Sequence, residues 1–180
     1  MRTEVCDYIL QNIGSTLEEV DEKAPEDLVE SILAAKKIFI YGVGRSGLAG
    51  KMFAVRLVQL GLDVHFVGDM TTPIVGEEDL SIVISNTGET MSIVQTANIS
   101  RRMGCKVVGI TSSENSKLSH ASNTVILLPT PRNGEKEVLA PLGTLFEVAV
   151  IIFFDSVVPL LMSKLGENEC NMRQRHAIWV

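Results

Sequence analysis

The stretch LSIVISNTGET (residues 80–90) joins a mostly apolar run directly to a cluster of small polar residues. The run LSIVI has the continuous apolar character of a strand that is buried on both faces of a sheet. The residues after it include three hydroxyl side chains, an amide and a glycine, and no lysine. A turn alone needs fewer hydroxyls. The stretch therefore predicts a strand that leads into a ligand-binding loop.

A second stretch, IFIYGVGRSG (residues 38–47), repeats this organisation with a glycine-rich loop. On both sides of these two stretches, short apolar runs alternate with segments whose apolar residues have helical spacing. The predicted helices are 4–20, 25–35, 46–60, 89–103, 116–121 and 145–162, and the predicted strands are 37–41, 64–67, 80–84, 106–111 and 124–128. Residues 129–143 read as a loop.

This alternation predicts an α/β fold, a three-layer α/β/α sandwich with a five-stranded parallel sheet. The expected strand order is the flavodoxin-like 2-1-3-4-5, in which the first and third strands are neighbours. Ligands bind in such sheets at the carboxyl ends of the strands that flank this switch point. The loops at 42–47 and 85–90 should therefore face one crevice.

Composition limits the class of protein. The 180 residues suit a single domain over 1–180, and 46% apolar with 21% charged residues is an ordinary globular balance. A net charge of −6 argues against a nucleic-acid partner. Three cysteines without a Cys-x-x-Cys pair argue against a disulfide framework or a zinc site. The N-terminal residues are too acidic and polar for a signal peptide, so we expect a cytoplasmic protein.

The segment LFEVAVIIFFDSVVPLLM (residues 145–162) has the length of a membrane span. Glu147, Asp155 and Pro159 interrupt it. Charges inside a span are costly, so we expect a buried helix of the core and no membrane contact.

Both loops lead into predicted helices, whose N-terminal N–H groups bind phosphate without a lysine. Hydroxyl side chains add donors, and a glycine lets the backbone approach the ligand closely. The alternative is that Ser85 or Thr87 only caps the next helix. Two such loops at one switch point favour a phosphate site. Its candidate residues are Arg45, Ser46, Ser85, Asn86, Thr87, Gly88 and Thr90.

The loop GVGRSG (residues 42–47) also matches the dinucleotide-binding pattern G-x-G-x-x-G. That pattern requires an acidic residue about 20 positions later, at the end of the second strand. Asp63 precedes the predicted strand and Asp69 follows it late. This interpretation also leaves the hydroxyls of 85–90 unexplained, so we prefer a phosphate site.

The motifs GVGRSG and SNTGET resemble those of the sugar-isomerase (SIS) domain, a phosphosugar-binding α/β fold. The stretches IFIYGVGRSGLAGKMFAVRL, HFVGDMTTP, PLGTLFE and RQRH together resemble the 6-phospho-3-hexuloisomerase family within it. The resemblance runs from about residue 35 to residue 176. It implies a cytoplasmic homotetramer that interconverts 3-hexulose 6-phosphate and fructose 6-phosphate in the ribulose monophosphate pathway. It also implies that neither a metal nor an organic cofactor is used.

Moving a carbonyl between two carbons requires a proton to leave one carbon and return to the other, which one carboxylate can do. Glu147 is expected in the first turn of its helix, where it would also stabilise the helix dipole. The resemblance implies that Glu147 is the catalytic base. It assigns His176 to moving hydroxyl protons or opening the sugar ring. In SIS isomerases such a late histidine can reach a neighbouring subunit's site, and the sequence leaves open which subunit supplies it.

The N-terminal helices (residues 1–35) carry an apolar stripe with no strand of their own to cover. We expect a subunit interface there, with packing on the chain's own sheet as the alternative. Two rival functions belong to the same superfamily. One is a phosphosugar-binding module without catalysis, as in some transcription regulators, and the other is a pentose-phosphate isomerase. Both commonly carry a further domain, for which the 180 residues leave no segment.

Overall fold

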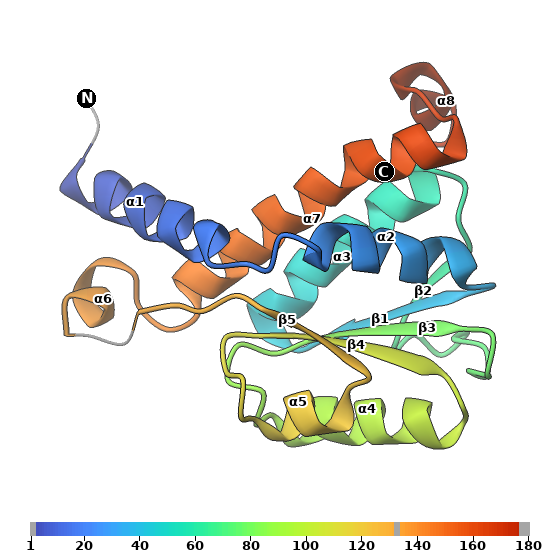
Figure 1. Cartoon of the computed structure of the whole chain (residues 1–180), viewed down its shortest axis with the longest axis horizontal. Coiled ribbons are helices and arrows are strands. Elements are labelled where there is room, and N and C mark those ends of the chain that lie inside the picture. The colour runs from blue at the N-terminus through green and yellow to red at the C-terminus, as the bar shows by residue number, and fades with distance from the viewer. Residues whose placement is uncertain (1–2, 132–133, 177–180) are drawn as a thin grey trace.

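The computed structural model describes residues 3–131 and 134–176. Its five strands form one parallel sheet in the order β2-β1-β3-β4-β5 (Figure 1). Both the parallel sheet and the strand order predicted from the sequence are confirmed. The strands are β1 (Ile38–Gly42), β2 (Val64–Phe66), β3 (Leu80–Ile84), β4 (Lys106–Thr111) and β5 (Thr124–Leu127).

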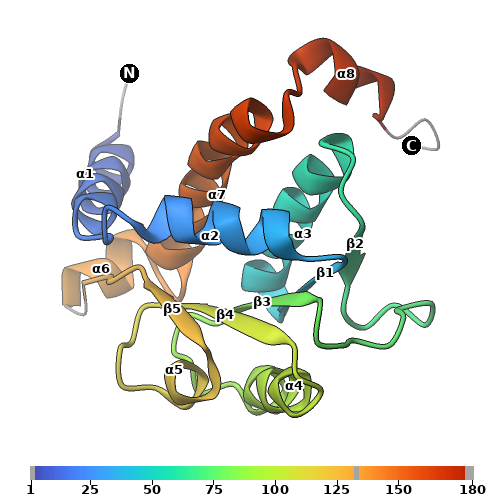
Figure 2. The same ribbon diagram turned by 45° about the vertical axis from the view of Figure 1, so that its right-hand side comes forward.

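Helices cover both faces of the sheet, which gives the predicted three layers (Figures 1 and 2). On one face, α4 and α5 pack through a buried cluster that includes Val83, Ile93 and Leu118. On the other face, α2, α3 and α7 form the larger core with the strands. The helices are α1 (Glu4–Glu18), α2 (Ala24–Ala34), α3 (Gly44–Gln59), α4 (Met91–Arg102), α5 (Lys117–Ala121), α6 (Gly134–Leu139), α7 (Thr144–Leu165) and α8 (Glu169–Gln174).

Two of these helices, α6 and α8, were not predicted. Each has only six residues, and α6 lies inside the stretch 129–143 that reads as a loop. The start of α8 did have a local signal, because the Asn168 side chain accepts a hydrogen bond from the Asn171 N–H at 3.0 Å.

The apolar helix α7 is long and apolar enough to cross a membrane by length and composition alone. In this structure it is the central helix of its layer, with α1, α2 and α3 packed around it. Phe154 of α7 stacks on Phe53 of α3 with ring centroids 4.0 Å apart. This packing is that of a core helix, as the sequence predicts.

Helix α1 packs on the first half of α7, not on the sheet. Ile13 is buried there together with Leu145 and Ala149. Val5 and Leu10 remain exposed on the same helix. The alternative of packing on the chain's own sheet therefore does not hold for α1, which packs on a helix, and the subunit interface stays a prediction.

A candidate active site at the carboxyl edge of the sheet

The loops after β1, β3 and β4 leave the sheet at one edge. Gly42 of β1 pairs with Ile84 of β3, and Ile84 pairs with Ile110 of β4. The two loops singled out in the sequence therefore follow adjacent strands that end at the same level, as predicted.

The glycines of the loop after β1 allow a close approach within the chain itself. A Cβ on Gly47 would lie 2.4 Å from the Gly42 carbonyl oxygen, and Gly44 has a positive φ of 59°. These glycines let α3 begin directly against the end of β1. Their pattern is explained by packing, so it gives no support of its own to a dinucleotide site.

Three helices that begin at this edge lack a side-chain cap. The N-cap residues of α3, α4 and α7 are Val43, Thr90 and Gly143, and none forms a side-chain hydrogen bond to its helix. Among the other described helices, side chains cap α1, α5 and α8, whereas α2 also lacks a side-chain cap. Uncapped first-turn N–H groups together with the helix dipole favour an anion at this edge.

The hydroxyls of the loop after β3 order the loop and do not cap α4. Ser85 Oγ accepts from Gly88 N at 3.1 Å, and Thr87 Oγ1 accepts from Glu89 N at 3.2 Å. Helix α4 begins only at Met91, so the capping alternative is wrong. Ser85 is 3% exposed, whereas Thr87 and Thr90 are exposed. Thr90 Oγ1 also accepts from Ser85 Oγ at 3.5 Å, so both exposed threonines take part in the hydrogen bonds of the loop.

Gly88 fixes this loop against α5. Its φ is +67°, and a Cβ there would lie 2.1 Å from Ser116 Oγ. Its carbonyl accepts from Leu118 N at 2.9 Å. Only glycine fits both this conformation and this contact.

Asn86 ties the loop after β3 to the loop after β4. Its carbonyl oxygen accepts from Ser112 N at 3.0 Å, and its side-chain oxygen accepts from Ser112 Oγ at 2.8 Å. Ser112 was missed by the sequence analysis. The sequence did contain a signal for Ser112, because this residue directly follows the strand predicted at 106–111, which should end beside the strand at 80–84.

Glu147 lies where these parts meet. It is 9% exposed in the first turn of α7, and Arg45 Nε of α3 donates a hydrogen bond to its carboxylate. A Cβ on Gly143 would lie 2.7 Å from Glu147 Oε1 and 3.5 Å from Asn86 Nδ2. Because Gly143 has no side chain, the Glu147 carboxylate and the Asn86 amide can both lie next to it.

Two predicted site residues have a different setting. Ser46 is buried in the first turn of α3. His176 lines a small cavity of about 160 Å³ with Arg56 and Gln59, at the C-terminal end of α3. Helix α7 runs from Thr144 to Leu165, and about 27 Å of it lies between Glu147 and that end of the fold. The chain's own His176 thus does not join its own Glu147.

A cavity of about 550 Å³ opens at this edge. One wall comes from the loops after β3 and β4, and the other from the loop after β5, α6 and the turn before α7. Its lining residues are Asn86, Thr87, Ser112, Thr130, Pro131, Lys136, Glu137, Leu142 and Gly143. Lys136 was another residue that the sequence analysis missed.

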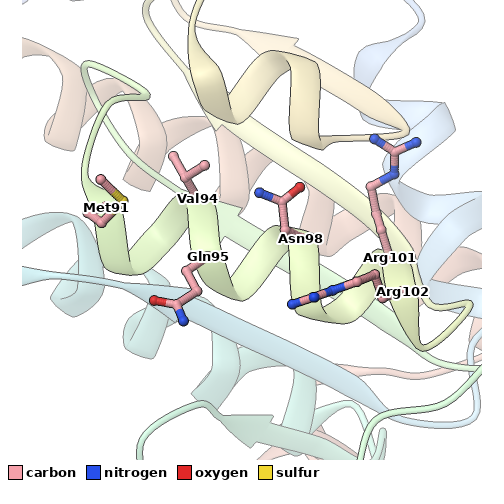
Figure 3. Close-up of a pocket in the computed structure, with 6 residues that line it drawn as sticks. All are labelled: Met91, Val94, Gln95, Asn98, Arg101 and Arg102. Atoms are coloured by element: carbon pink, nitrogen blue, oxygen red, sulfur yellow. The ribbon is translucent and has the colours of Figure 1, made fainter.

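A second cavity, of about 660 Å³, lies along one face of α4 (Figure 3). Its lining side chains, from Met91 to Arg102, all come from this one helix, and none is a predicted site residue. Ligand sites bring together polar groups from several elements. The cavity at the sheet edge is therefore the candidate site.

Within residues 3–131 and 134–176, no group of three or more His, Cys, Asp or Glu side chains is arranged to hold a metal ion.

Comparisons with known proteins place the chain in a family. Residues 31–150 match the SIS domain. A 3-hexulose-6-phosphate isomerase of Bacillus subtilis is 34% identical over 179 residues, covering 97% of each chain. One of the same name from Methanocaldococcus jannaschii is 36% identical over 151 residues, covering 84% of this chain and 81% of the relative.

A crystal structure of a hypothetical protein from Methanococcus jannaschii, for which a molecular function of 3-hexulose-6-phosphate isomerase was inferred, superposes with a TM-score of 0.88. It is 32% identical and covers 99% of this chain and 100% of that one. The chain belongs to the SIS domain family. Within that family it is an isomerase, in the group of the relatives named 3-hexulose-6-phosphate isomerase.

Proposed function

We propose that the protein interconverts D-arabino-3-hexulose 6-phosphate and D-fructose 6-phosphate through an enediol. The names of the relatives support this substrate pair. The observation that carries the chemistry is the sheltered carboxylate of Glu147, bound by Arg45 at the edge where three helices begin without side-chain caps. Shifting a carbonyl between carbons 2 and 3 requires one carboxylate to transfer the proton, placed beside a site that binds the phosphate.

The phosphate is bound by the loop of residues 85–90 and the N-terminus of α4. Thr87 and Thr90 supply exposed hydroxyls, and the uncapped first turn of α4 supplies N–H groups and the positive end of its dipole. Ser85 and Gly88 maintain the shape of the loop. Binding the phosphate in this way fixes one end of the sugar while leaving the carbonyl end for chemistry.

Proton transfer is the task of Glu147. Its carboxylate removes the proton from carbon 2 of the 3-ketose, the electron pair forms the C2–C3 double bond, and the oxygen on carbon 3 gains a proton. Collapse of the enediol then releases the proton on the oxygen of carbon 2, while Glu147 returns its proton to carbon 3. One base on one face of the enediol therefore serves both half-reactions.

Arg45 orients this base and helps bind the anionic substrate. Its Nε holds the Glu147 carboxylate, and the guanidinium carries further N–H donors. Its side chain is 65% exposed, so these donors lie on the solvent side of the pair. Ser46, one residue later, is buried in the first turn of α3.

The hydroxyl protons of the enediol move through His176 of another subunit, because His176 in the same chain lies at the opposite end of α7. Histidine suits this work because its side chain exchanges protons near neutral pH. This role implies a homo-oligomer, which we propose to be a tetramer. We further assign the enzyme to the cytoplasmic ribulose monophosphate pathway, with no metal or organic cofactor.

The test is a coupled assay on the purified protein. 3-Hexulose 6-phosphate is supplied, and the fructose 6-phosphate formed is converted to glucose 6-phosphate and oxidised by a dehydrogenase. We expect NADPH to form in proportion to enzyme. Binding of fructose 6-phosphate without turnover would indicate a non-catalytic binding module instead. Turnover of pentose phosphates alone would indicate a pentose-phosphate isomerase.

A further inference from the structure

The cavity at the sheet edge has an uneven distribution of charge. On the side of the loops after β3 and β4, its lining side chains are the neutral Asn86, Thr87 and Ser112. On the facing side, Lys136 and Glu137 are the two charged residues of the lining. A phosphate monoester carries about −1.5 to −2 charges at pH 7, which neutral donors alone do not balance.

Of these two charged residues, Lys136 is the one held at the cavity. It is half-buried, whereas Glu137 is exposed. Its Nζ donates a hydrogen bond to the carbonyl oxygen of Leu142, which also lines the cavity.

The turn that Lys136 contacts leads directly to Glu147. Leu142 has a positive φ of 57°, which is uncommon for a residue with a side chain, and it is 86% exposed. Burial of the Leu142 side chain therefore does not hold this conformation. One residue later, the carbonyl of Gly143 accepts the helical hydrogen bond from Glu147 N at 2.9 Å. The contact from Lys136 thus connects α6 to the first turn of α7.

We propose that Lys136 is a further substrate-binding residue, whose ammonium binds the phosphate of the sugar phosphate from the side opposite the loop of residues 85–90. Through Leu142 the same ammonium supports the turn that begins α7. The assignment rests on the proposed function, because it takes a phosphate monoester as the ligand. It supplies a point charge that complements the helix N-terminus.

The test is calorimetric titration of fructose 6-phosphate and of inorganic phosphate into the full-length protein and its variants. Lys136→Gln should weaken the binding of both by about tenfold or more, as expected for losing a hydrogen bond to a charged group. Lys136→Arg should keep most of the affinity. Glu137→Gln, next to it in α6, should leave the affinity unchanged or raise it, because it removes a negative charge from the lining.

The matched control is Lys164→Gln, which removes an equally charged but exposed side chain in the last turn of α7. It should bind both ligands as the wild type does. Unchanged binding in Lys136→Gln would overturn the proposal, as would loss of fructose 6-phosphate binding with inorganic phosphate unaffected. A lower turnover with unchanged binding would reduce Lys136 to a support of the turn, which also contradicts it.

These outcomes are separate from failure of the proposed function. Wild-type protein that binds neither fructose 6-phosphate nor inorganic phosphate would overturn both proposals. Wild-type protein that isomerises the hexulose phosphate while Lys136→Gln binds normally would overturn the role of Lys136 alone.

Discussion

The ion pair between Arg45 and Glu147 allows a quantitative test of how sheltered the carboxylate is. The Glu147 side chain is 12% exposed and that of Arg45 is 65% exposed. Removing one partner of a fully buried pair costs about 3–5 kcal/mol, and removing one from a surface pair costs about 0–1 kcal/mol. Because only one partner is sheltered, Arg45→Met should cost about 2 kcal/mol of unfolding free energy, between those limits.

For a chain of this size, that loss corresponds to a fall in melting temperature of about 4–8 °C. The assay is thermal or urea unfolding at a fixed protein concentration, because any subunit dissociation also contributes. Arg173→Met is the control, since Arg173 and Glu169 are 78% and 83% exposed and form an i,i+4 pair. That pair should contribute at most about 0.5 kcal/mol.

A double variant separates charge from packing. Arg45→Met combined with Glu147→Gln should recover most of the lost stability, because a neutral amide needs no counter-charge. If Arg45→Met costs no more than Arg173→Met, the Glu147 carboxylate is screened by water and the sheltered-base reasoning is wrong.

Three further predictions concern the loop, a buried thiol and assembly. Gly88→Ala should lose about 2–3 kcal/mol in urea unfolding, because of the positive φ and the contact with Ser116. Gly14→Ala in α1, where nothing lies within 4 Å of the added carbon, should gain about 0.5–1 kcal/mol and serves as the control. Burial, reinforced by the nearby charge of Asp79, raises the pKa of the Cys105 thiol to about 12 from 9.0. The folded state then keeps a proton that the unfolded state loses, so stability should fall as the pH rises from about 9 towards 12. A Cys105→Ala variant should show a shallower fall in urea unfolding across that range, and an equal slope would refute the assignment. Light scattering should give about four times the chain mass of 19.6 kDa, and a monomer mass would contradict the shared site.

Much of the fold was predictable because the strands carry continuous apolar runs. Leu80–Ile84 is buried along its whole length, as its sequence indicated. The glycines were harder to interpret. Gly88 was predicted to admit a ligand, yet it also admits Ser116 from a neighbouring part of the chain. The contact joins two segments that are far apart in the sequence, so a local sequence pattern does not reveal it.

The meeting of the two loops was predictable from strand order, because parallel strands place their carboxyl ends at one edge. The partner of Glu147 was not, since Arg45 lies 102 positions away and its direction depends on how α3 packs against α7. The cavity wall formed by Lys136 was missed for a related reason. It belongs to a six-residue helix inside a stretch that read as a loop.

The most direct test of the proposed chemistry is the exchange of the substrate's carbon-bound hydrogen with heavy water in Glu147→Gln. This change keeps the size of the side chain and removes its basic oxygen. We predict that both exchange and isomerisation fall by about 100- to 10,000-fold, as is typical for the loss of a general base. Binding of fructose 6-phosphate should persist, because the phosphate contacts lie on the loop of residues 85–90. Full exchange and full isomerase activity in Glu147→Gln would contradict the role of Glu147 as the base.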